Sequence, residues 1–259
     1  MRNNKLFTAI LILMFIFLLG PFLVIIIASF GSETIMRFPP KGFALTWYEK
    51  AFTIKMFRTT FFISLKTGLA ATFTALVMGI PAAYAMVRHN FPGKSKVELY
   101  FSSPAIVPGL VVGFALLRFF IYYTRMPVIM GLYLGHTAIL FPYTVRVVSA
   151  SLRNFDPYVE EAAVSLGSSP LHSFLVVVLP NIRSGVIAAF ILAFITSFNN
   201  VPISLFLTGP GVSTLPIQML VYMEYYFDPT IAALSSILIV FTVIIIQSAE
   251  KVLGISKYM

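Results

Sequence analysis

Long apolar runs alternate with short polar segments along most of the chain. A helix of about 20 apolar residues crosses the hydrocarbon core of a bilayer. The pattern predicts spans at about 6–30, 61–87, 99–124, 126–149, 184–207 and 230–249. The boundary between the third and fourth spans depends on Arg125 and its neighbours alone. We therefore predict an all-α, polytopic membrane protein with six transmembrane helices.

The first apolar run resembles a secretory signal because Arg2 and Lys5 precede it. A signal peptide has an apolar region of only about 7 to 15 residues, and this run is longer. We expect it to be a retained spanning helix.

Composition supports a membrane protein. Of the 259 residues, 59% are hydrophobic and only 10% are charged, with a mean hydropathy of +0.93. In a soluble protein, about a quarter of the residues are charged. The apolar surplus of this chain is therefore expected to face lipid. The segments between the runs are too short for a separate soluble domain, and residues 1–259 are predicted to form a single transmembrane domain.

The net charge of +9 does not indicate nucleic-acid binding. The basic residues lie mostly at the ends of apolar runs, where they anchor helices and set their orientation. The chain has no cysteine, which excludes disulfides, thiolate metal sites and cysteine nucleophiles.

Orientation rests on the distribution of Lys and Arg. With the N-terminus inside, the inner segments hold ten of the eighteen basic residues, namely Arg2, Lys5, Arg88, Lys94, Lys96, Arg146, Arg153, Arg183, Lys251 and Lys257. Five basic residues in the first outer loop oppose this orientation, whereas the last outer segment, 208–229, has none. We predict that both termini are cytoplasmic.

The polar segment 150–183, between the fourth and fifth spans, predicts two short helices that meet at an elbow. Asp156-Pro157 and Ser169-Pro170 are typical helix starts, because the side-chain oxygen caps free N–H groups and proline suits the first helical position. Gly167 lies between them, where a helix would end in a left-handed residue.

The same segment contains a longer motif. It reads Glu161-Ala162-Ala163, then Gly167 after three residues, then Val177, Leu179 and Pro180 after nine more. This resembles the EAA loop of inner-membrane permeases of binding-protein-dependent ABC importers, E-A-A-x3-G-x9-I-x-L-P. Val177 is the only departure from the pattern.

The resemblance extends towards the spermidine/putrescine branch of this family. It includes the runs 197–201 and 206–210, the pair Leu215-Pro216, and His136 and Pro142 in the fourth span. It implies a type I ABC importer permease fold in a bacterial plasma (inner) membrane. It also implies that the chain carries a small polar solute, polyamine-like or related, across that membrane.

The resemblance further implies that the loop docks on a cytoplasmic ABC ATPase dimer. The expected coupling residues are Glu160, Glu161, Ala162, Ala163, Gly167, Leu179 and Pro180. A second permease subunit, expected to be a different chain, and an extracytoplasmic solute-binding protein complete the implied assembly.

ATP is expected to bind the partner. Gly93-Lys94-Ser95 resembles the end of a P-loop, but Arg88 occupies the position of its first glycine and a span precedes it. The chain is therefore predicted not to be an enzyme. We expect no catalytic residue, metal site or cofactor in it, with ATP and Mg on the partner ATPase.

Polar residues within spans are candidates for the substrate path, because burying them in a membrane costs free energy. Ser197, Asn199 and Asn200 in the fifth span are the best candidates, and inter-helix hydrogen bonding is the alternative role. The spans contain no Asp or Glu, so nothing in them specifically holds a polycation.

Small residues at helical spacing predict close packing within the bundle. They form two pairs, Gly109-x-x-x-Gly113 and Gly131-x-x-x-Gly135.

Two other classes of function remain open from the residues. A secondary transporter working without an ATPase would need titratable groups or ion ligands at mid-membrane, and His136 is one of few. An intramembrane enzyme would need a nucleophile with a base or clustered metal ligands, and the three histidines are scattered.

Overall fold

The computed structural model describes residues 5–102 and 106–253, which are helical over most of their length. The only β-type pairing among them is an isolated bridge between Gly209 and Val212. The all-α prediction is thus confirmed. The described residues divide into two compact units, one within 1–59 and 218–244 and the other within 60–217 and 245–259. A single transmembrane domain stays a prediction.

The first unit contains α1 (Lys5–Ala28), α2 (Thr46–Thr53), the end of α12 (Leu215–Tyr225) and much of α13 (Thr230–Leu253). The loop between α1 and α2 is fixed by polar contacts. The Trp47 indole N–H donates to the Gly31 carbonyl at 2.7 Å, and the Ser29 and Tyr48 hydroxyls lie 2.6 Å apart. Almost every described side chain of α1 is exposed in this single subunit, as expected for a helix that faces lipid.

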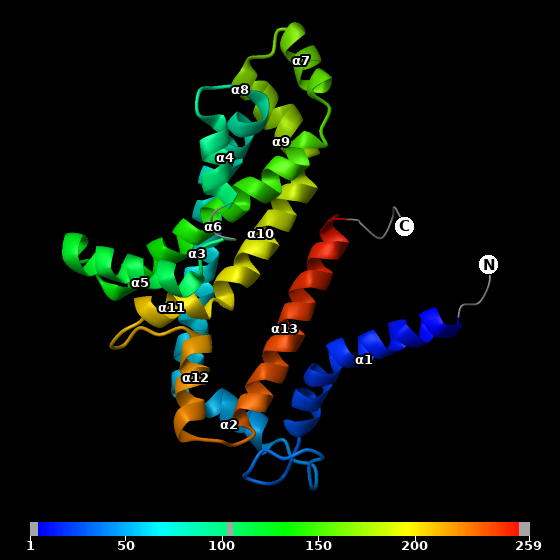
Figure 1. Cartoon of the computed structure of the whole chain (residues 1–259), viewed down its shortest axis with the longest axis vertical. Coiled ribbons are helices and arrows are strands. Elements are labelled where there is room, and N and C mark those ends of the chain that lie inside the picture. Colours follow the sequence, from blue (N-terminus) through cyan, green and yellow to red (C-terminus); the bar gives the residue numbers. More distant parts are fainter. Residues whose placement is uncertain (1–4, 103–105, 254–259) are drawn as a thin grey trace. The chain divides into compact units, whose positions relative to one another are not determined.

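The second unit is built around α6 (Val128–Arg153), half of whose apolar stretch is buried. Helix α10 (Arg183–Phe198) packs along it, and α11 (Val201–Leu207) packs against both α6 and α5 (Gly109–Phe119) (Figure 1). Helix α4 (Lys94–Ser102) packs on α6, and side chains of α3 (Lys55–Arg88) share a buried cluster with the C-terminal half of α6.

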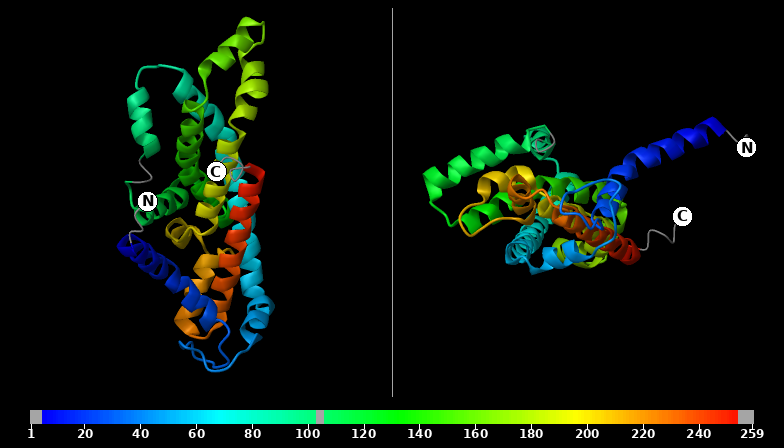
Figure 2. Two further views of the ribbon diagram at one scale, coloured as in Figure 1. Left: turned by 90° about the vertical axis from the view of Figure 1, so that its right-hand side faces the viewer. Right: turned by 90° about the horizontal axis from the view of Figure 1, so that it is seen from below.

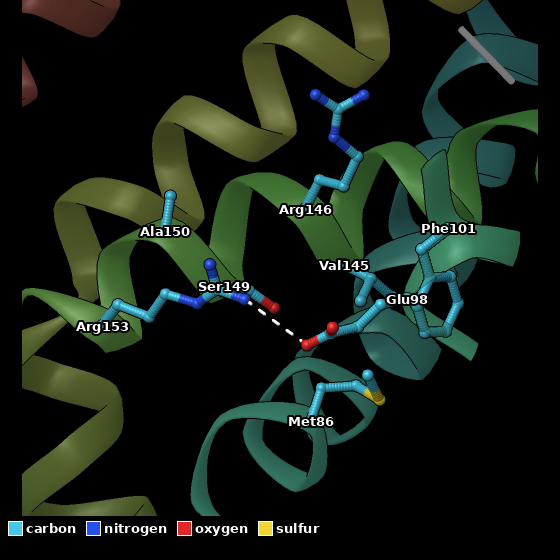
Figure 3. A pocket seen from close by; sticks show the side chains of 8 residues that line it. All are labelled: Met86, Glu98, Phe101, Val145, Arg146, Ser149, Ala150 and Arg153. Carbon is cyan, nitrogen blue, oxygen red and sulfur yellow. Dashed lines mark ion pairs between the residues drawn. The ribbon is translucent and has the colours of Figure 1, made fainter. Parts of the chain in front are cut away.

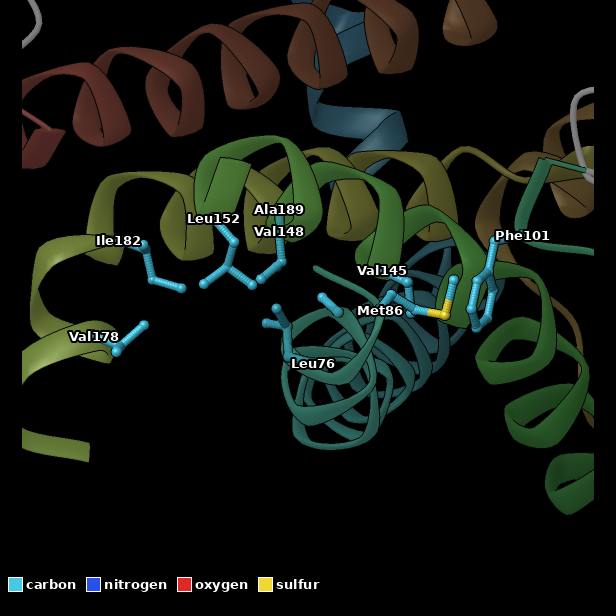
Figure 4. Close-up of a cluster of buried hydrophobic side chains, with 10 residues drawn as sticks. Leu76, Met86, Phe101, Val145, Val148, Leu152, Val178, Ile182 and Ala189 are labelled. Carbon is cyan, nitrogen blue, oxygen red and sulfur yellow. The ribbon is translucent and has the colours of Figure 1, made fainter. Parts of the chain in front are cut away.

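The main core of this unit is apolar and is made by several elements. Figure 4 shows side chains of α3, α4, α6 and α10 meeting with those of the segment before α10. Leu152, Val148 and Val178 are fully buried there. The core therefore joins the C-terminal half of α6 to the segment that follows it.

The third predicted span, 99–124, is not one helix. It is divided into α4, which ends at Ser102, α5, which begins at Gly109, and a π-helical turn, η2 (Phe120–Thr124). Pro108 precedes α5 with an extended backbone, ψ 130°, and cannot donate an N–H to a continuing helix. Pro104 of the same predicted span lies outside the described residues.

The fifth predicted span, 184–207, is also interrupted. Helix α10 ends at Phe198 and α11 begins at Val201, with Asn199 and Asn200 between them. Asn200 adopts an extended conformation, and Pro202 stands in the first turn of α11. The break therefore follows from an amide cap and a proline at the start of a new helix.

Among the described residues, four helices are long and apolar enough to cross a membrane: α1, α3, α6 and α13. A fifth candidate is the pair Pro170–Asn181 and Arg183–Phe198, which bends by 72°, and Gly109–Thr124 is a shorter apolar helix. The predicted total of six is compatible with these elements.

Candidate functional site

The segment between α6 and α10 begins with a well-capped helix, α7 (Pro157–Ser165). The Asp156 carboxylate accepts a hydrogen bond from the Tyr158 N–H at 3.0 Å, and Pro157 occupies the first helical turn. The predicted helix start is confirmed.

The end of α7 is a Schellman motif. Gly167 has φ +95°, and its N–H donates to the Val164 carbonyl at 2.9 Å. The Ser168 N–H donates to the Ala163 carbonyl at 3.1 Å. These two bonds satisfy carbonyls that the helix end would otherwise leave unpaired. The predicted left-handed turn at Gly167 is therefore confirmed.

A second helical segment starts at Ser169, whose hydroxyl accepts a hydrogen bond from the His172 N–H at 3.3 Å. It runs through α8 (Pro170–Ser173), the π-helical turn η3 (Phe174–Val178) and α9 (Leu179–Asn181). It then bends by 72° into α10. Leu179 and Pro180 lie just before this bend.

Helix α7 lies at one tip of the second unit, beyond the ends of α6 and α10 (Figure 2). Glu161 and Ala162 are exposed there, and Ala163 is half-buried. Two large side chains of the same segment are also exposed, Tyr158 at 73% and Leu166 at 90%. These exposed apolar side chains are available for contact with another protein.

Glu160 differs from its neighbour Glu161, because it is buried and faces the bundle. Its carboxylate accepts hydrogen bonds from the Tyr84 hydroxyl and from the Arg88 Nε–H, the latter at 3.2 Å. The Arg88 guanidinium also lies 5.6 Å from the centre of the Phe155 ring. These contacts, which we call the α7–α3 brace, tie the first turn of α7 to the last turns of α3.

The sequence analysis did not identify Tyr84 and Arg88 as site residues. They are 76 and 72 residues from Glu160 along the chain. A basic residue at a span end has an orientation role by default, and only the fold shows that Arg88 also has a specific carboxylate partner.

A buried polar cluster lies in the interior of the second unit. One ring nitrogen of His136, Nδ1, is 2.7 Å from the Ser197 hydroxyl, and the other, Nε2, is 3.1 Å from the Ser204 hydroxyl. All three side chains are at most 2% exposed. Ser197 belongs to the last turn of α10 and Ser204 to α11, so His136 bridges the two halves of the interrupted span.

The three predicted substrate-path residues have different surroundings. The Ser197 hydroxyl is engaged by His136. The Asn200 side-chain oxygen accepts the Ile203 N–H at 2.9 Å and caps α11. Asn199 is exposed at the end of α10. Of the three, Asn199 is the one whose side chain is open to a solute.

Helices α5 and α11 approach each other closely through glycines. A Cβ atom on Gly113 would lie 2.8 Å from the Pro202 carbonyl oxygen, and one on Gly109 would lie 2.9 Å from Pro202 Cβ. A Cβ on Gly135 of α6 would likewise meet Leu207 of α11. The prediction that these small residues serve packing is confirmed at these three positions, which hold α11 in place beside the break.

The first unit has its own charged contact outside the spans. Lys50 Nζ lies 2.5 Å from an Asp228 oxygen, which also accepts from the Tyr222 hydroxyl at 3.0 Å. The hydrogen bond to Asp228 raises the pKa of Lys50 above its ordinary value of 10.5. Burial of Asp228 favours its neutral form, but the hydrogen bonds from Lys50, Thr230 and Tyr222 outweigh it, so the pKa of Asp228 falls below 3.8.

Within the described ranges, no three His, Asp or Glu side chains are grouped so that they could hold a metal ion.

The comparisons with known proteins agree on one family. The model of the family described as "binding-protein-dependent transport system inner membrane component" matches residues 75–253. The putrescine transport system permease protein PotI of Escherichia coli (strain K12) is 30% identical over 237 residues, covering 89% of this chain and 84% of that protein. The spermidine/putrescine transport system permease protein PotC of Haemophilus influenzae is 25% identical, covering 94% and 95%.

Solved structures show the same fold. A chain of a bacterial ABC transporter involved in the import of the acidic polysaccharide alginate superposes with a TM-score of 0.73 at 17% identity, covering 97% of this chain and 98% of that one. A chain of the MetNI methionine ABC transporter in an inward-facing conformation gives a TM-score of 0.58 at 18% identity, covering 74% and 92%.

Proposed function

The chain belongs to the family of binding-protein-dependent transport system inner membrane components, and from this premise we propose how it couples to ATP and what it transports. It is a permease subunit of an ABC importer, with the type I fold. In the proposed assembly, both termini are cytoplasmic. A separate ABC ATPase dimer binds ATP and Mg, and this chain catalyses no covalent chemistry.

The exposed tip of α7 is the single observation that supports this proposal best. Glu161 and Ala162 are accessible on a helix whose two ends are both capped, so the helix is ordered before a partner binds. Small alanine side chains let a partner approach the helix closely. The neighbouring Leu166, at 90% exposure, offers an apolar anchor. We propose that this tip inserts in a groove of the ATPase.

ATP binding would then move the spans through rigid elements. When the ATPase dimer closes, the docked α7 helices move with it as rigid bodies. The bend that follows Leu179 and Pro180 leads directly into α10, and the α7–α3 brace connects α7 to α3. A path closed on one side of the membrane would thereby open on the other.

The proposed cargo is a small polar solute, polyamine-like or related, delivered by an extracytoplasmic binding protein. The relatives named above for putrescine and spermidine support this class. The break between α10 and α11, with Asn199 exposed, is the proposed contact point. A second permease subunit, a different chain, would complete the path.

Ala162→Glu tests the coupling proposal. The position is exposed, and glutamate is a good helix former, so α7 keeps its structure while its docking surface gains bulk and charge. We expect a tagged variant, purified from gently solubilised membranes, to lose the co-purifying ATPase and to lose transport. The matched control is Asn90→Glu, which adds the same charge at an exposed position in the turn between α3 and α4.

Two results would contradict the proposal. If Ala162→Glu retained both the ATPase and transport, α7 would not be the docking helix. If the unmodified chain transported solute with no ATPase in the preparation, it would be a self-sufficient carrier.

A further inference from the structure

Two hollows flank α6 near the end that leads into the polar segment. The first has a volume of about 290 Å³ and lies among α3, α4 and α6 (Figure 3). The second, of about 350 Å³, lies between α6 and α10 and is lined by Tyr143, Arg146, Val147, Ala150 and Leu192. Arg146 and Ala150 border both hollows. Arg146 therefore stands on the ridge between them.

Two arginines border the first hollow, Arg146 and Arg153, and their electrostatic surroundings differ. Arg153 forms an ion pair with Glu98 across the first hollow, at 3.7 Å. Arg146 points away from that pair (Figure 3). In the part of the chain that the structure describes, Arg146 forms no ion pair. Its positive charge is left for a ligand.

The second hollow has the chemistry of a lipid headgroup site. Its lining includes no acidic residue, so nothing there repels an anion. The Arg146 guanidinium at its edge can donate two parallel hydrogen bonds to a phosphate. Val147, Ala150 and Leu192 present apolar surface beside that charge. A phosphate joined to an acyl chain matches this combination.

The depth of Arg146 fits the same ligand. It is seven residues before Arg153, the last residue of α6, which places it about 10 Å along the axis from the helix end. A charged side chain at that depth in a spanning helix requires water, a counter-charge or a headgroup, because bare hydrocarbon does not solvate it. Basic pockets between transmembrane helices on the cytoplasmic side bind anionic headgroups.

We propose that Arg146 and the hollow between α6 and α10 bind the phosphate and the first acyl carbons of an anionic phospholipid of the inner leaflet. The neighbouring hollow contains the acidic side chain of Glu98, paired with Arg153, which disfavours an anion there, so the lipid is directed to the α10 side of α6. The cytoplasmic position of this site rests on the proposed orientation. The site itself does not depend on the transported solute or on ATPase docking.

Native mass spectrometry of the full-length chain, purified in mild detergent, tests this proposal. Phosphatidylglycerol and phosphatidylcholine with the same acyl chains are added at equal concentration. We expect the chain to retain phosphatidylglycerol about fivefold better, and Arg146→Gln to remove the preference. Arg183→Gln is the matched control, because it removes a cation that is also exposed but lines neither hollow.

Three results would overturn the proposal. The first is equal retention of both lipids by the native chain, and the second is an unchanged preference in Arg146→Gln. The third is displacement of the lipid by millimolar inorganic phosphate, which would indicate a free-anion site.

If Arg146→Gln reduced recovery of a second permease subunit and left lipid retention unchanged, this face of α6 would be a subunit interface instead. We expect Ala162→Glu to lose the ATPase but to retain the lipid. This result would show that ATPase docking and lipid binding are independent.

Discussion

His136 connects α10 and α11, two helices that are separated by a break in the backbone. A neutral imidazole has one donor and one acceptor nitrogen, so one serine hydroxyl donates to it and the other accepts. Removing the ring by His136→Ala leaves Ser197 and Ser204 without this partner in a water-poor interior. Inter-helix hydrogen bonds in membranes contribute about 0.6 kcal/mol each on average and about 1.7 at most.

We therefore expect His136→Ala to lower the free energy of unfolding by about 1 to 3 kcal/mol, measured by denaturant titration in detergent. A double-mutant cycle with Ser197→Ala should give a coupling energy of about 0.5 to 2 kcal/mol. A coupling energy near zero would show that the ring contributes only by filling space.

Lys50 and Asp228 give the first unit a defined pH dependence. The lowered pKa of Asp228 stabilises the folded state above pH 3.8, and this contribution is lost as the pH falls through the folded-state pKa. The raised pKa of Lys50 stabilises the folded state below pH 10.5. That contribution is lost as the pH rises through the folded-state pKa of Lys50.

The contribution of this pair should thus be constant between about pH 5 and pH 10. Asp228→Asn should make the segment 218–230 more susceptible to protease within this window, and the difference from the native chain should shrink below pH 3.8. Glu224→Gln, which removes a nearby charge without touching the pair, is the control. An equal difference at every pH would mean that the ion pair does not stabilise this segment.

At the scale of elements, the end of α7 depends on backbone conformation alone. A Cβ atom at Gly167 would meet no atom within 4 Å, yet φ is +95°. Gly167→Ala should therefore cost about 1 kcal/mol through backbone strain, with no steric clash. Hydrogen exchange should show faster exchange of the Gly167 and Ser168 amides, which donate the two closing bonds. Gly167→Asn should exchange more slowly than the alanine variant, because asparagine tolerates the left-handed region better.

Gly113 illustrates the opposite case, in which space is limiting. Gly113→Ala places a methyl group 2.8 Å from a backbone carbonyl of α11, which cannot move independently of its helix. We expect a loss of stability of about 1 to 3 kcal/mol, measured by thermal unfolding in detergent. Gly20→Ala in α1 is the control, because a Cβ there meets nothing within 4 Å and the substitution should stabilise the helix slightly. Equal effects of the two substitutions would argue against close packing of α5 on α11.

The elements that sequence reasoning predicted well are those fixed by local chemistry. Asp156-Pro157, Ser169-Pro170 and Gly167 each act on their own turn of the chain, and each has the predicted conformation. The breaks before Gly109 and after Phe198 were missed because hydropathy continues across them. The amide at Asn200 was noted as a polar group in a span, but its role as a helix cap depends on the backbone being interrupted there.

At the scale of the whole molecule, function depends on contacts between distant segments, which a single sequence does not display. Glu160 precedes the recognisable motif and has the same charge as Glu161, yet only Glu160 is buried against α3. The family resemblance led to the proposal that segment 150–183 docks on the ATPase. It did not identify the residues that connect this segment to the spans.

The α7–α3 brace leads to a prediction that separates docking from transmission. Glu160→Gln keeps an acceptor for Tyr84 but removes the charge that pairs with Arg88, whose Nη2 is already buried without a partner among the described residues. Since Glu161 and Ala162 keep their exposure, the variant should retain the ATPase in a pull-down. Solute transported per ATP hydrolysed should fall several-fold, because motion of α7 no longer reaches α3 fully.

Glu161→Gln, on the exposed face, should instead weaken ATPase retention. If Glu160→Gln lost the ATPase as well, the brace would serve to hold α7 in shape, and transmission would run through the bend into α10 alone.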